Sequence, residues 1–186
     1  LFTPGPNSQA KSVAERHRFW LNIKNSENEF KQILLGYASG ASNSLDLNYD
    51  AEYLSSGMPL DFYSIIENKK LVIQGRELPF LESDSIAIGY KTTVSDNLKI
   101  EIDHKDDFFN DRPIFLVDKK LNKIHNISEG SYQFDSEAGT FNDRFSIIYC
   151  NTTLRNSISD NLSKDILVSV KNHNIHIESL AEPIKE

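Results

Sequence analysis

Four oxygen-bearing side chains recur at alternate positions of one polar segment, and they are Asp46, Asn48, Asp50 and Glu52. Alternate residues of an extended chain project to the same side, and hard cations such as calcium prefer clusters of oxygen ligands. The segment departs from a calcium-binding EF-hand loop, because the sixth position from Asp46 is Ala51 instead of glycine and the twelfth is Gly57 instead of glutamate. Two interpretations stay open, a calcium site or a loop organised by Asx-turns, and we favour the Asx-turns.

A second group of polar residues places three carboxylates beside one histidine: Asp103, Asp106 and Asp107 lie close to His104 in the sequence. Carboxylates next to an imidazole could perform general acid–base catalysis. Acidic runs of this kind are, however, typical of solvated turns. The chain also contains no Gly-x-Ser-x-Gly nucleophile elbow, no phosphate-binding loop and no His-Glu-x-x-His metalloprotease motif. We therefore predict that the protein is not an enzyme and needs no cofactor, the calcium alternative aside.

Aromatic side chains could supply a third kind of chemistry, because exposed rings stack on sugar rings. The candidates are Trp20, Tyr49, Tyr53 and Tyr63. Most aromatic residues of an all-β chain build its core, so this interpretation ranks below a purely structural one. The alternative function is a glycan- or calcium-binding module that uses the segment Ala38–Pro59 and these rings, with a polysaccharide as partner.

The elements that would position these residues are short strands rich in β-branched and aromatic side chains. In Leu98–Asp103 every second residue is apolar, which puts one face on a core and the other in water. By the same alternation, Trp20 should face away from Phe19 and Leu21. The segment Glu27–Leu35 also fits a helical period, but we predict a strand because its neighbours are strands. The predicted strands are Arg16–Lys24, Phe30–Tyr37, Phe62–Ile66, Leu71–Gly75, Ser85–Lys91, Leu98–Asp103, Ile114–Asp118, Lys123–Ile127, Ser131–Phe134 and Arg144–Cys150.

This spacing of about ten strands predicts an all-β fold, an antiparallel β-sandwich with a jelly-roll-like arrangement. A net charge of −7, from 20 basic and 27 acidic residues, argues against nucleic acid as a partner, since a phosphate backbone favours a basic surface. No apolar run approaches the roughly 18 residues of a transmembrane segment. The single cysteine, Cys150, follows an apolar run and is predicted to be a small buried residue.

Composition divides the 186 residues into four parts. Residues 1–14, with prolines and small polar residues, form an incoming linker, and residues 15–153 form the β-sandwich. Residues 154–164 form a second linker. Residues 165–186 contain a further strand pattern, Ile166–Val170, but are too few to bury a core of their own. We predict that they are the first strands of a second small β-sandwich, truncated here, and that such a strand is disordered or pairs with another chain.

Five separated motifs occur in the order found in one bacterial family, and they are His17–Asn22, Phe30–Tyr37, Asp61–Ser64, Leu71–Arg76 and Gly139–Phe145. Over roughly residues 16–153 the chain resembles the region that precedes the sorting signal in proteins exported by the type IX secretion system of Bacteroidota, the phylum of gliding flavobacteria. The segment Ile166–Ile177 resembles the opening of the type C sorting domain of such cargo. The chain departs from that pattern because the remaining sorting-domain strands and the terminal secretion signal do not follow.

The resemblance implies a non-catalytic C-terminal segment of a cell-surface or secreted protein, which leaves through the periplasm and the outer membrane. Residues 15–153 would be a stalk or adaptor between an upstream functional region and the sorting signal. The implied partners are the type IX translocon and its shuttle proteins, and the candidate contacts are Ile166, Val168 and Val170. Asp84-Ser85-Ile86 matches the O-glycosylation pattern of this phylum, which makes Ser85 a candidate modification site.

Overall fold

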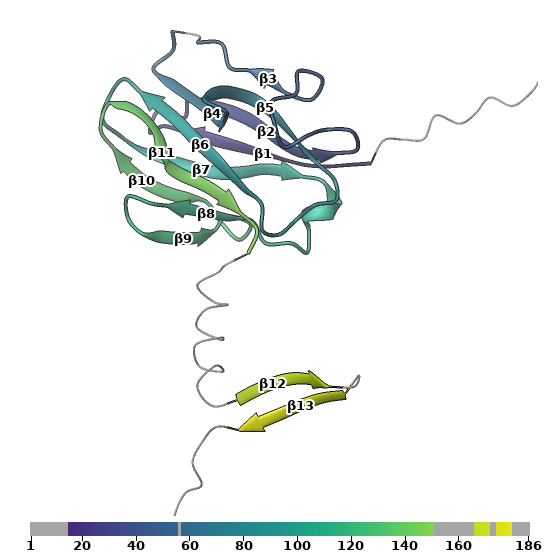
Figure 1. Cartoon of the computed structure of the whole chain (residues 1–186). Coiled ribbons are helices and arrows are strands. Elements are labelled where there is room, and N and C mark those ends of the chain that lie inside the picture. Colours follow the sequence, from purple (N-terminus) through teal and green to yellow (C-terminus); the bar gives the residue numbers. More distant parts are fainter. Residues whose placement is uncertain (1–14, 56, 151–165, 172–173, 180–186) are drawn as a thin grey trace, which may run out of the picture. The chain divides into compact units, whose positions relative to one another are not determined.

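The computed structural model describes residues 15–55, 57–150, 166–171 and 174–179, the last two ranges by their backbone alone. The chain divides into two compact units, Leu1–Tyr149 and Cys150–Glu186. The first unit is built of strands and the second contributes one strand pair (Figure 1). The division falls near Thr153, where the sequence predicts that the sandwich ends.

The described residues of the first unit form eleven strands and one short 3-10 helix, and each of the ten strands predicted from the sequence is present. The additional strand, β3, is two residues long and lies in the segment Ala38–Pro59. The last strand begins at Gly139 instead of Arg144, because Gly139–Phe141 pairs with β6 before a register shift. The elements are β1 (Arg16–Lys24), β2 (Phe30–Ala38), β3 (Ala51–Glu52), β4 (Leu60–Ile66), β5 (Lys69–Glu77), β6 (Ser85–Thr92), β7 (Asp96–Lys105), η1 (Asp107–Phe109), β8 (Phe115–Asp118), β9 (Lys123–Asn126), β10 (Tyr132–Ser136) and β11 (Gly139–Ile148).

The strands form one continuous sheet in the order β10-β7-β1-β2-β5-β4-β6-β11-β8-β9, with β3 beside β5. Within this sheet the pairing of β2 with β5 is parallel, with Leu34 opposite Ile73 and Gly36 opposite Gly75. The prediction of a purely antiparallel sandwich is wrong at this pair. The reason is the long excursion after β2, which passes through β3 and β4 and returns the chain so that β5 runs in the direction of β2.

The sheet folds over on itself around one hydrophobic core (Figure 1). Phe19 and Leu21 of β1 are fully buried, and Trp20 between them is half-buried on the opposite side, as the alternation predicts. Strands far apart in the sheet order meet in the core: Phe134 of β10 makes an edge-to-face contact with Phe145 of β11, 4.8 Å between ring centroids. The all-β, sandwich-like fold expected from the sequence is confirmed.

The second unit contains β12 (Ile166–Lys171) and β13 (Asn174–Ser179), which pair antiparallel along their whole length. The strand predicted at Ile166–Val170 is therefore present, and it pairs with β13 of its own chain. Cys150, at the start of this unit, is half-buried and not the buried residue that we predicted. Among the described residues, no helix has the length and apolar character needed to cross a membrane.

Candidate functional site

One side of β7, β1, β2 and β5 points away from the core, and we call it the outer face. Trp20 and Asn22 lie on this face because they alternate with the buried residues of β1. Trp20 is flanked by His104 of β7 and by Leu34 of β2, and Leu34 lies opposite Ile73 of β5. Strand pairing thus brings the aromatic candidate Trp20 next to the acidic segment around His104, more than eighty residues away in the sequence.

A network of planar polar groups lies on part of the outer face. Asn22 Nδ2 donates to Asp103 Oδ1 at 3.2 Å. Gln32 Nε2 donates to Asn22 Oδ1 at 2.9 Å and to Asp103 Oδ2 at 3.3 Å. His104 Nδ1 lies 2.7 Å from Asp103 Oδ2. The hydrogen bond from His104, supported by those from Asn22 and Gln32, holds the pKa of the Asp103 carboxyl below its ordinary value, so the carboxylate is ionised at neutral pH.

The network borders a hollow of about 420 Å³ that is lined by Asn22, Lys24, Asn28, Phe30, Gln32 and Asp103. Asn22 is only 3% exposed, whereas the Phe30 side chain at the rim is 57% exposed. Beside the hollow, Glu101 forms ion pairs with Lys24 and with Lys99, the second at 3.0 Å. The hollow therefore presents hydrogen-bonding groups in fixed positions, with the neighbouring charges paired.

Trp20 is held between its neighbours on the outer face. Its ring stacks on His104 with 3.8 Å between centroids and 17° between planes. The Arg18 guanidinium carbon lies 5.0 Å from the Trp20 ring centroid, and Arg18 Nε donates to Asp106 Oδ2 at 2.9 Å. Since His104 occupies one face of the ring, Trp20 is less available to a sugar than the sequence analysis considered.

The acidic residues near His104 do not converge on one point. Asp103 belongs to the polar network, and Asp106 is paired with Arg18. Asp107 begins η1 and accepts a hydrogen bond from Asn110 Nδ2 at 3.2 Å. The segment has the form of a turn, the alternative that the sequence analysis favoured over a catalytic site.

A second hollow, of about 400 Å³, lies where the outer face meets the loop between β2 and β3. Gly36 and Gly75, opposite each other in the parallel pair, form part of its lining. Tyr49 lies over Gly75 so closely that a Cβ added to Gly75 would come 2.6 Å from the Tyr49 Cβ. The Tyr49 hydroxyl donates to the Ser39 carbonyl at 2.8 Å. The apolar side chains in the lining include Leu34, Ala51 and Ile73.

The loop residues considered as calcium ligands bind protein groups instead. Asp50 Oδ1 accepts the Gly75 N–H at 2.8 Å, and Asp50 Oδ2 accepts the Asp46 N–H at 2.7 Å. Asp46 Oδ1 accepts the Asn48 N–H at 3.0 Å, which forms an Asx-turn. Glu52 is engaged in an ion pair outside this group. The predicted Asx-turn is thus present at Asp46. In the described part of the chain no three His, Cys, Asp or Glu side chains gather as a metal site.

The other sequence candidates differ in exposure. Tyr63 is fully buried and its hydroxyl donates to Asn142 Oδ1 at 2.8 Å, so its ring cannot serve as a sugar platform; Tyr53 packs beside it at 5.3 Å. Ser85 is exposed at the start of β6. The translocon candidates lie at alternate positions of β12, with side chains outside what the structure describes, and they are Ile166, Val168 and Val170.

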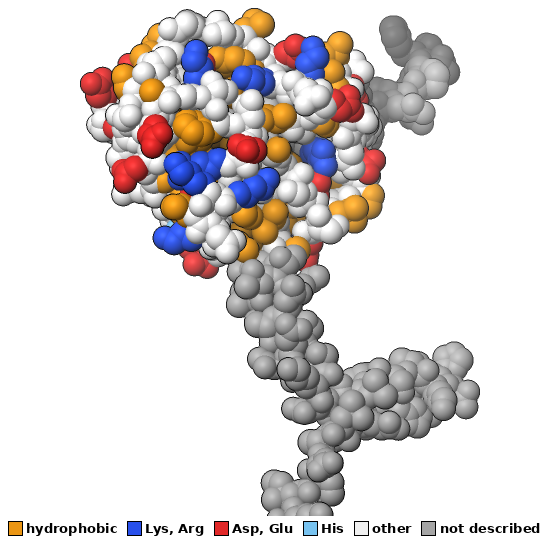
Figure 2. Space-filling view, turned by 60° about the vertical axis from the view of Figure 1, so that its left-hand side comes forward, with side chains coloured by type: hydrophobic (Ala, Val, Ile, Leu, Met, Phe, Trp, Pro, Cys, Tyr) orange, Lys and Arg blue, Asp and Glu red, His pale blue; other side chains and the backbone are white. Residues whose placement is uncertain are grey.

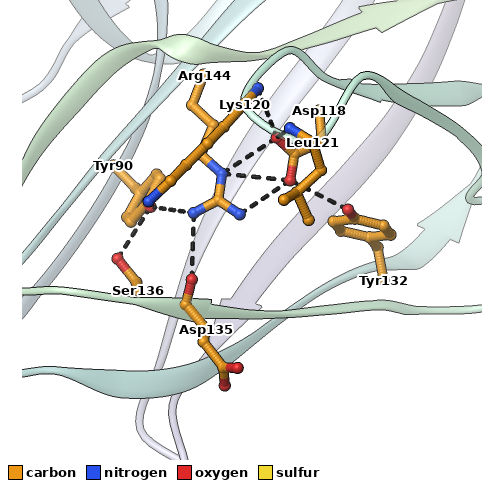
Figure 3. Close-up of polar contacts among 8 residues, drawn as sticks. All are labelled: Tyr90, Asp118, Lys120, Leu121, Tyr132, Asp135, Ser136 and Arg144. Carbon is orange, nitrogen blue, oxygen red and sulfur yellow. Dashed lines mark hydrogen bonds and ion pairs between the residues drawn. The ribbon is translucent and has the colours of Figure 1, made fainter.

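Sequence reasoning missed a buried ion pair between Arg144 of β11 and Asp118 at the end of β8 (Figure 3). Arg144 Nη2 donates to Asp118 Oδ2 at 2.9 Å, and the two side chains are 4% and 1% exposed. Arg144 Nη1 donates to the Tyr90 hydroxyl at 3.2 Å, and the Tyr132 hydroxyl donates to Asp118 Oδ2 at 3.0 Å. The cluster therefore joins side chains of β6, β8, β10 and β11 inside the core (Figure 3).

Electrostatics in this cluster favour the ionised pair. Burial by itself raises the pKa of Asp118, but the hydrogen bonds from Arg144 and from the Leu121 N–H outweigh burial, and the pKa lies below its ordinary value. Burial and the hydrogen bond to Asp118 raise the pKa of Tyr132 to about 12. The arrangement can hold strands together, and it leaves the proton on Tyr132 and the charge on Asp118.

Comparisons with known proteins place the first unit in a family. No match is found among curated proteins or among solved structures. One family model matches residues 3–149, which include all of β1–β11. The chain therefore belongs to the family described as Domain of unknown function (DUF8693).

Proposed function

We propose that the first unit is a non-catalytic adaptor in a cell-surface or secreted protein that leaves the cell through the type IX secretion system. Residues 15–153 form a folded spacer between an upstream functional region and a sorting signal. The route runs through the periplasm and the outer membrane, where the translocon and its shuttle proteins are the partners. The starting point is the resemblance of the five ordered motifs to the region before the sorting signal of such cargo.

The observation that carries this proposal is where the five motifs lie in the fold. They fall on five strands, β1, β2, β4, β5 and β11. Residues that perform catalysis gather around one reacting centre. Here each motif instead contributes a side chain that is at most 1% exposed, and examples are Phe19, Leu35, Phe62, Leu71 and Phe145. This distribution supports a role in building a scaffold.

A spacer with a single cysteine must hold its shape through its core, because it can form no internal disulfide. Among the described residues, Arg144 pairs with Asp118 at 4% and 1% exposure, and Arg76 pairs with Asp84 at 12% and 14%. Asp84 also accepts a hydrogen bond from the Tyr37 hydroxyl at 2.7 Å. Buried pairs of this kind strongly oppose any local rearrangement that separates them. They support a rigid adaptor.

The second unit would carry the contact with the export machinery. A two-stranded ribbon is marginal by itself, and its outer edges have free backbone groups that can pair with further strands. We assign the translocon or shuttle contacts to Ile166, Val168 and Val170 of β12. Ser85, exposed at the start of β6, is the proposed site of O-glycosylation.

Localisation in a gliding bacterium tests the proposal. A fluorescent protein is fused upstream of residues 1–186 with the natural continuation restored. One comparison stops the fusion at Thr153, and another deletes residues 15–153 and keeps the remainder. We expect surface or medium fluorescence for the full fusion and for the deletion, and periplasmic retention for the fusion that stops at Thr153. Val168→Asp should reduce export more than Ser169→Asp, the matched change one position along β12.

The outcomes are distinct. Loss of export only when the tail is missing would support a cargo whose address follows the adaptor. Equal export of the full and the Thr153-terminated fusions, or periplasmic retention of both, would contradict the sorting assignment. If the deletion of residues 15–153 is the only change that abolishes export, the sorting signal lies in the first unit, which would contradict the spacer role.

A further inference from the structure

We propose that the outer face binds a neutral oligosaccharide, whose hydroxyl groups hydrogen-bond to the network of Asn22, Gln32 and Asp103 and whose apolar ring faces pack against the side chains beside it. This function goes beyond the adaptor role and does not depend on it. The site extends from the hollow at Phe30 to the hollow at Gly36 and Gly75.

The polar network has a fixed geometry and unused hydrogen-bonding capacity. Asn22 is 3% exposed and is bonded through both its amide nitrogen and its amide oxygen. Among the described residues, the Gln32 amide oxygen and His104 Nε2 have no hydrogen-bond partner. Amide and carboxylate groups place donors and acceptors side by side, which suits neighbouring hydroxyl groups. Because the groups are already held in place, a ligand would lose little free energy in ordering them.

The charges beside the network favour a neutral ligand. The ion pairs are Lys24 and Lys99 with Glu101 and Arg18 with Asp106, and the Asp103 carboxylate accepts hydrogen bonds from Asn22, Gln32 and His104. These pairs leave no cluster of unpaired cations beside the network, within the described residues, to attract a phosphate or sulfate. On the side of the first unit that Figure 2 shows, acidic and basic side chains are interspersed. A neutral ligand binds through hydrogen bonds and packing alone and disturbs none of the pairs.

The shape of the outer face suits an extended chain of sugar rings. Between Arg18 and Lys24 the face runs about 20 Å along β1, at about 3.3 Å per residue. At the Lys24 end the Phe30 side chain is exposed, and level with Trp20 and Leu34 the side chain of Ile73 is 39% exposed. Gly36 and Gly75 let the Arg18 and Tyr49 side chains pack closely against the backbone, and Leu34 and Ile73 line the hollow beside them. Sugar rings have apolar faces that pack on such surfaces while their hydroxyl groups reach the polar network.

An extended peptide fits this face less well. Peptides that add a strand need a free sheet edge, but β1 lies between β7 and β2, and β2 lies between β1 and β5. Their backbone groups are therefore used within the sheet. A docked helix needs a continuous apolar stripe, and the polar network interrupts the row of Phe30, Leu34 and Ile73.

Affinity gel electrophoresis of the whole chain tests the proposal. The gels contain soluble xylan, mannan, mixed-linkage β-glucan or starch, with dextran sulfate as a charged probe, and calorimetry gives the Kd for each polysaccharide that retards the protein. We expect binding to at least one neutral polysaccharide. Gln32→Ala should weaken it about tenfold through the loss of hydrogen bonds, and Ile73→Arg should weaken it at least as much by filling the hollow at Gly75.

Two control substitutions change exposed residues outside the outer face: Thr140→Ala on β11 is the control for Gln32→Ala, and Val94→Arg before β7 is the control for Ile73→Arg. Binding within about twofold of the wild type is expected for both. Urea midpoints should be unchanged for Ile73→Arg, Thr140→Ala and Val94→Arg because each side chain is exposed. Gln32→Ala removes the donor to the amide oxygen of Asn22, which is 3% exposed, and should lower the urea midpoint, so its binding is measured without urea, where the variant stays folded. Absence of binding to all four neutral polysaccharides would overturn the proposal. So would binding that survives both outer-face substitutions, or retardation by dextran sulfate alone. None of these results would alter the localisation of the fluorescent fusions, so failure here is distinguishable from failure of the adaptor proposal.

Discussion

Removal of the Arg144 guanidinium should destabilise the first unit strongly. In Arg144→Met the Asp118 carboxylate, 1% exposed, loses its donors Nε and Nη2, at 3.3 and 2.9 Å. It keeps neutral donors only: the Tyr132 hydroxyl and the backbone N–H groups of Lys120 and Leu121. Removing one partner of a buried ion pair lowers the free energy of unfolding by about 3 to 5 kcal/mol. That is a large share of the roughly 5 to 15 kcal/mol by which a domain is stable.

A second substitution separates the unpaired charge from the loss of packing. Asp118→Asn removes the negative charge but keeps an oxygen for the two backbone N–H groups of the turn. Alone, it leaves the Arg144 cation, 4% exposed, without its counter-ion, although the Phe134 ring centroid lies 4.4 Å from the guanidinium carbon. The double variant buries no unpaired charge. Its destabilisation should therefore be smaller than the sum of the two single effects by about 1 to 3 kcal/mol.

Urea denaturation of the whole chain measures these differences. The single tryptophan, Trp20, is half-buried against His104 and reports unfolding of the first unit by its fluorescence. Both single variants should unfold at lower urea than the wild type with an unchanged m-value, and the double variant should lie above the position that additivity predicts. Single effects that add to within about 0.5 kcal/mol, or an Arg144→Met variant as stable as the wild type, would refute the reasoning.

Three further predictions concern other parts of the first unit. Burial raises the pKa of Tyr63 and of Tyr132 to about 12, above the value near 10 of an unfolded chain. The stability that these two groups contribute below pH 10 should therefore be lost as the pH rises from 10 to 12. In urea denaturation at pH 9 and pH 11, Tyr132→Phe should show a smaller loss of unfolding free energy than the wild type. Asp50→Ala removes the acceptor of the Gly75 and Asp46 N–H groups and should lower the free energy of unfolding by about 1 to 3 kcal/mol. It should also speed limited proteolysis of the loop between β2 and β3. Equal proteolysis of mutant and wild type would contradict the role of Asp50 in holding this loop. Gly89→Ala would place its Cβ 2.3 Å from the Tyr63 ring and should be destabilising by about 1 to 3 kcal/mol in thermal melts, whereas Gly130→Ala, with no atom within 4 Å, should be neutral.

Alternation in the sequence predicted ten of the eleven strands described in the first unit, but it did not predict which strands pair. The inward and outward positions of β1 follow from the sequence, because Phe19 and Leu21 alternate with polar or aromatic residues. The parallel pairing of β2 with β5 does not, because it depends on how the intervening 30 or so residues return the chain, and no local pattern encodes that path. The start of β11 was missed for a related reason: Gly139–Phe141 lacks an apolar alternation and is a strand because β6 pairs with it.

The candidate site was predictable in its parts and not as a whole. Trp20 and the acids around His104 could be selected by residue type, but their contact requires the pairing of β1 with β7. Arg144 and Asp118 lie 26 positions apart, and a charged residue beside Phe145 is normally read as solvent-facing. For the acidic residues of the loop between β2 and β3, residue type and spacing suggested a contact that the structure does not contain. Their alternate spacing suggested a shared cation, whereas in the structure the Asp50 carboxylate accepts the backbone N–H groups of Asp46 and Gly75.

β1 shows how stability and binding can be separated in one motif. Its inward residues, Phe19 and Leu21, are fully buried, and its outward residue Asn22 carries the polar network. If the motif His17–Asn22 serves only the scaffold, an outward change such as Ile73→Arg on β5 should alter neither stability nor any binding. If the outer face also binds a glycan, the same change should leave the urea midpoint in place and weaken binding, since an exposed side chain contributes little to the core. The two measurements on one variant therefore distinguish an adaptor that only connects from an adaptor that also holds a ligand.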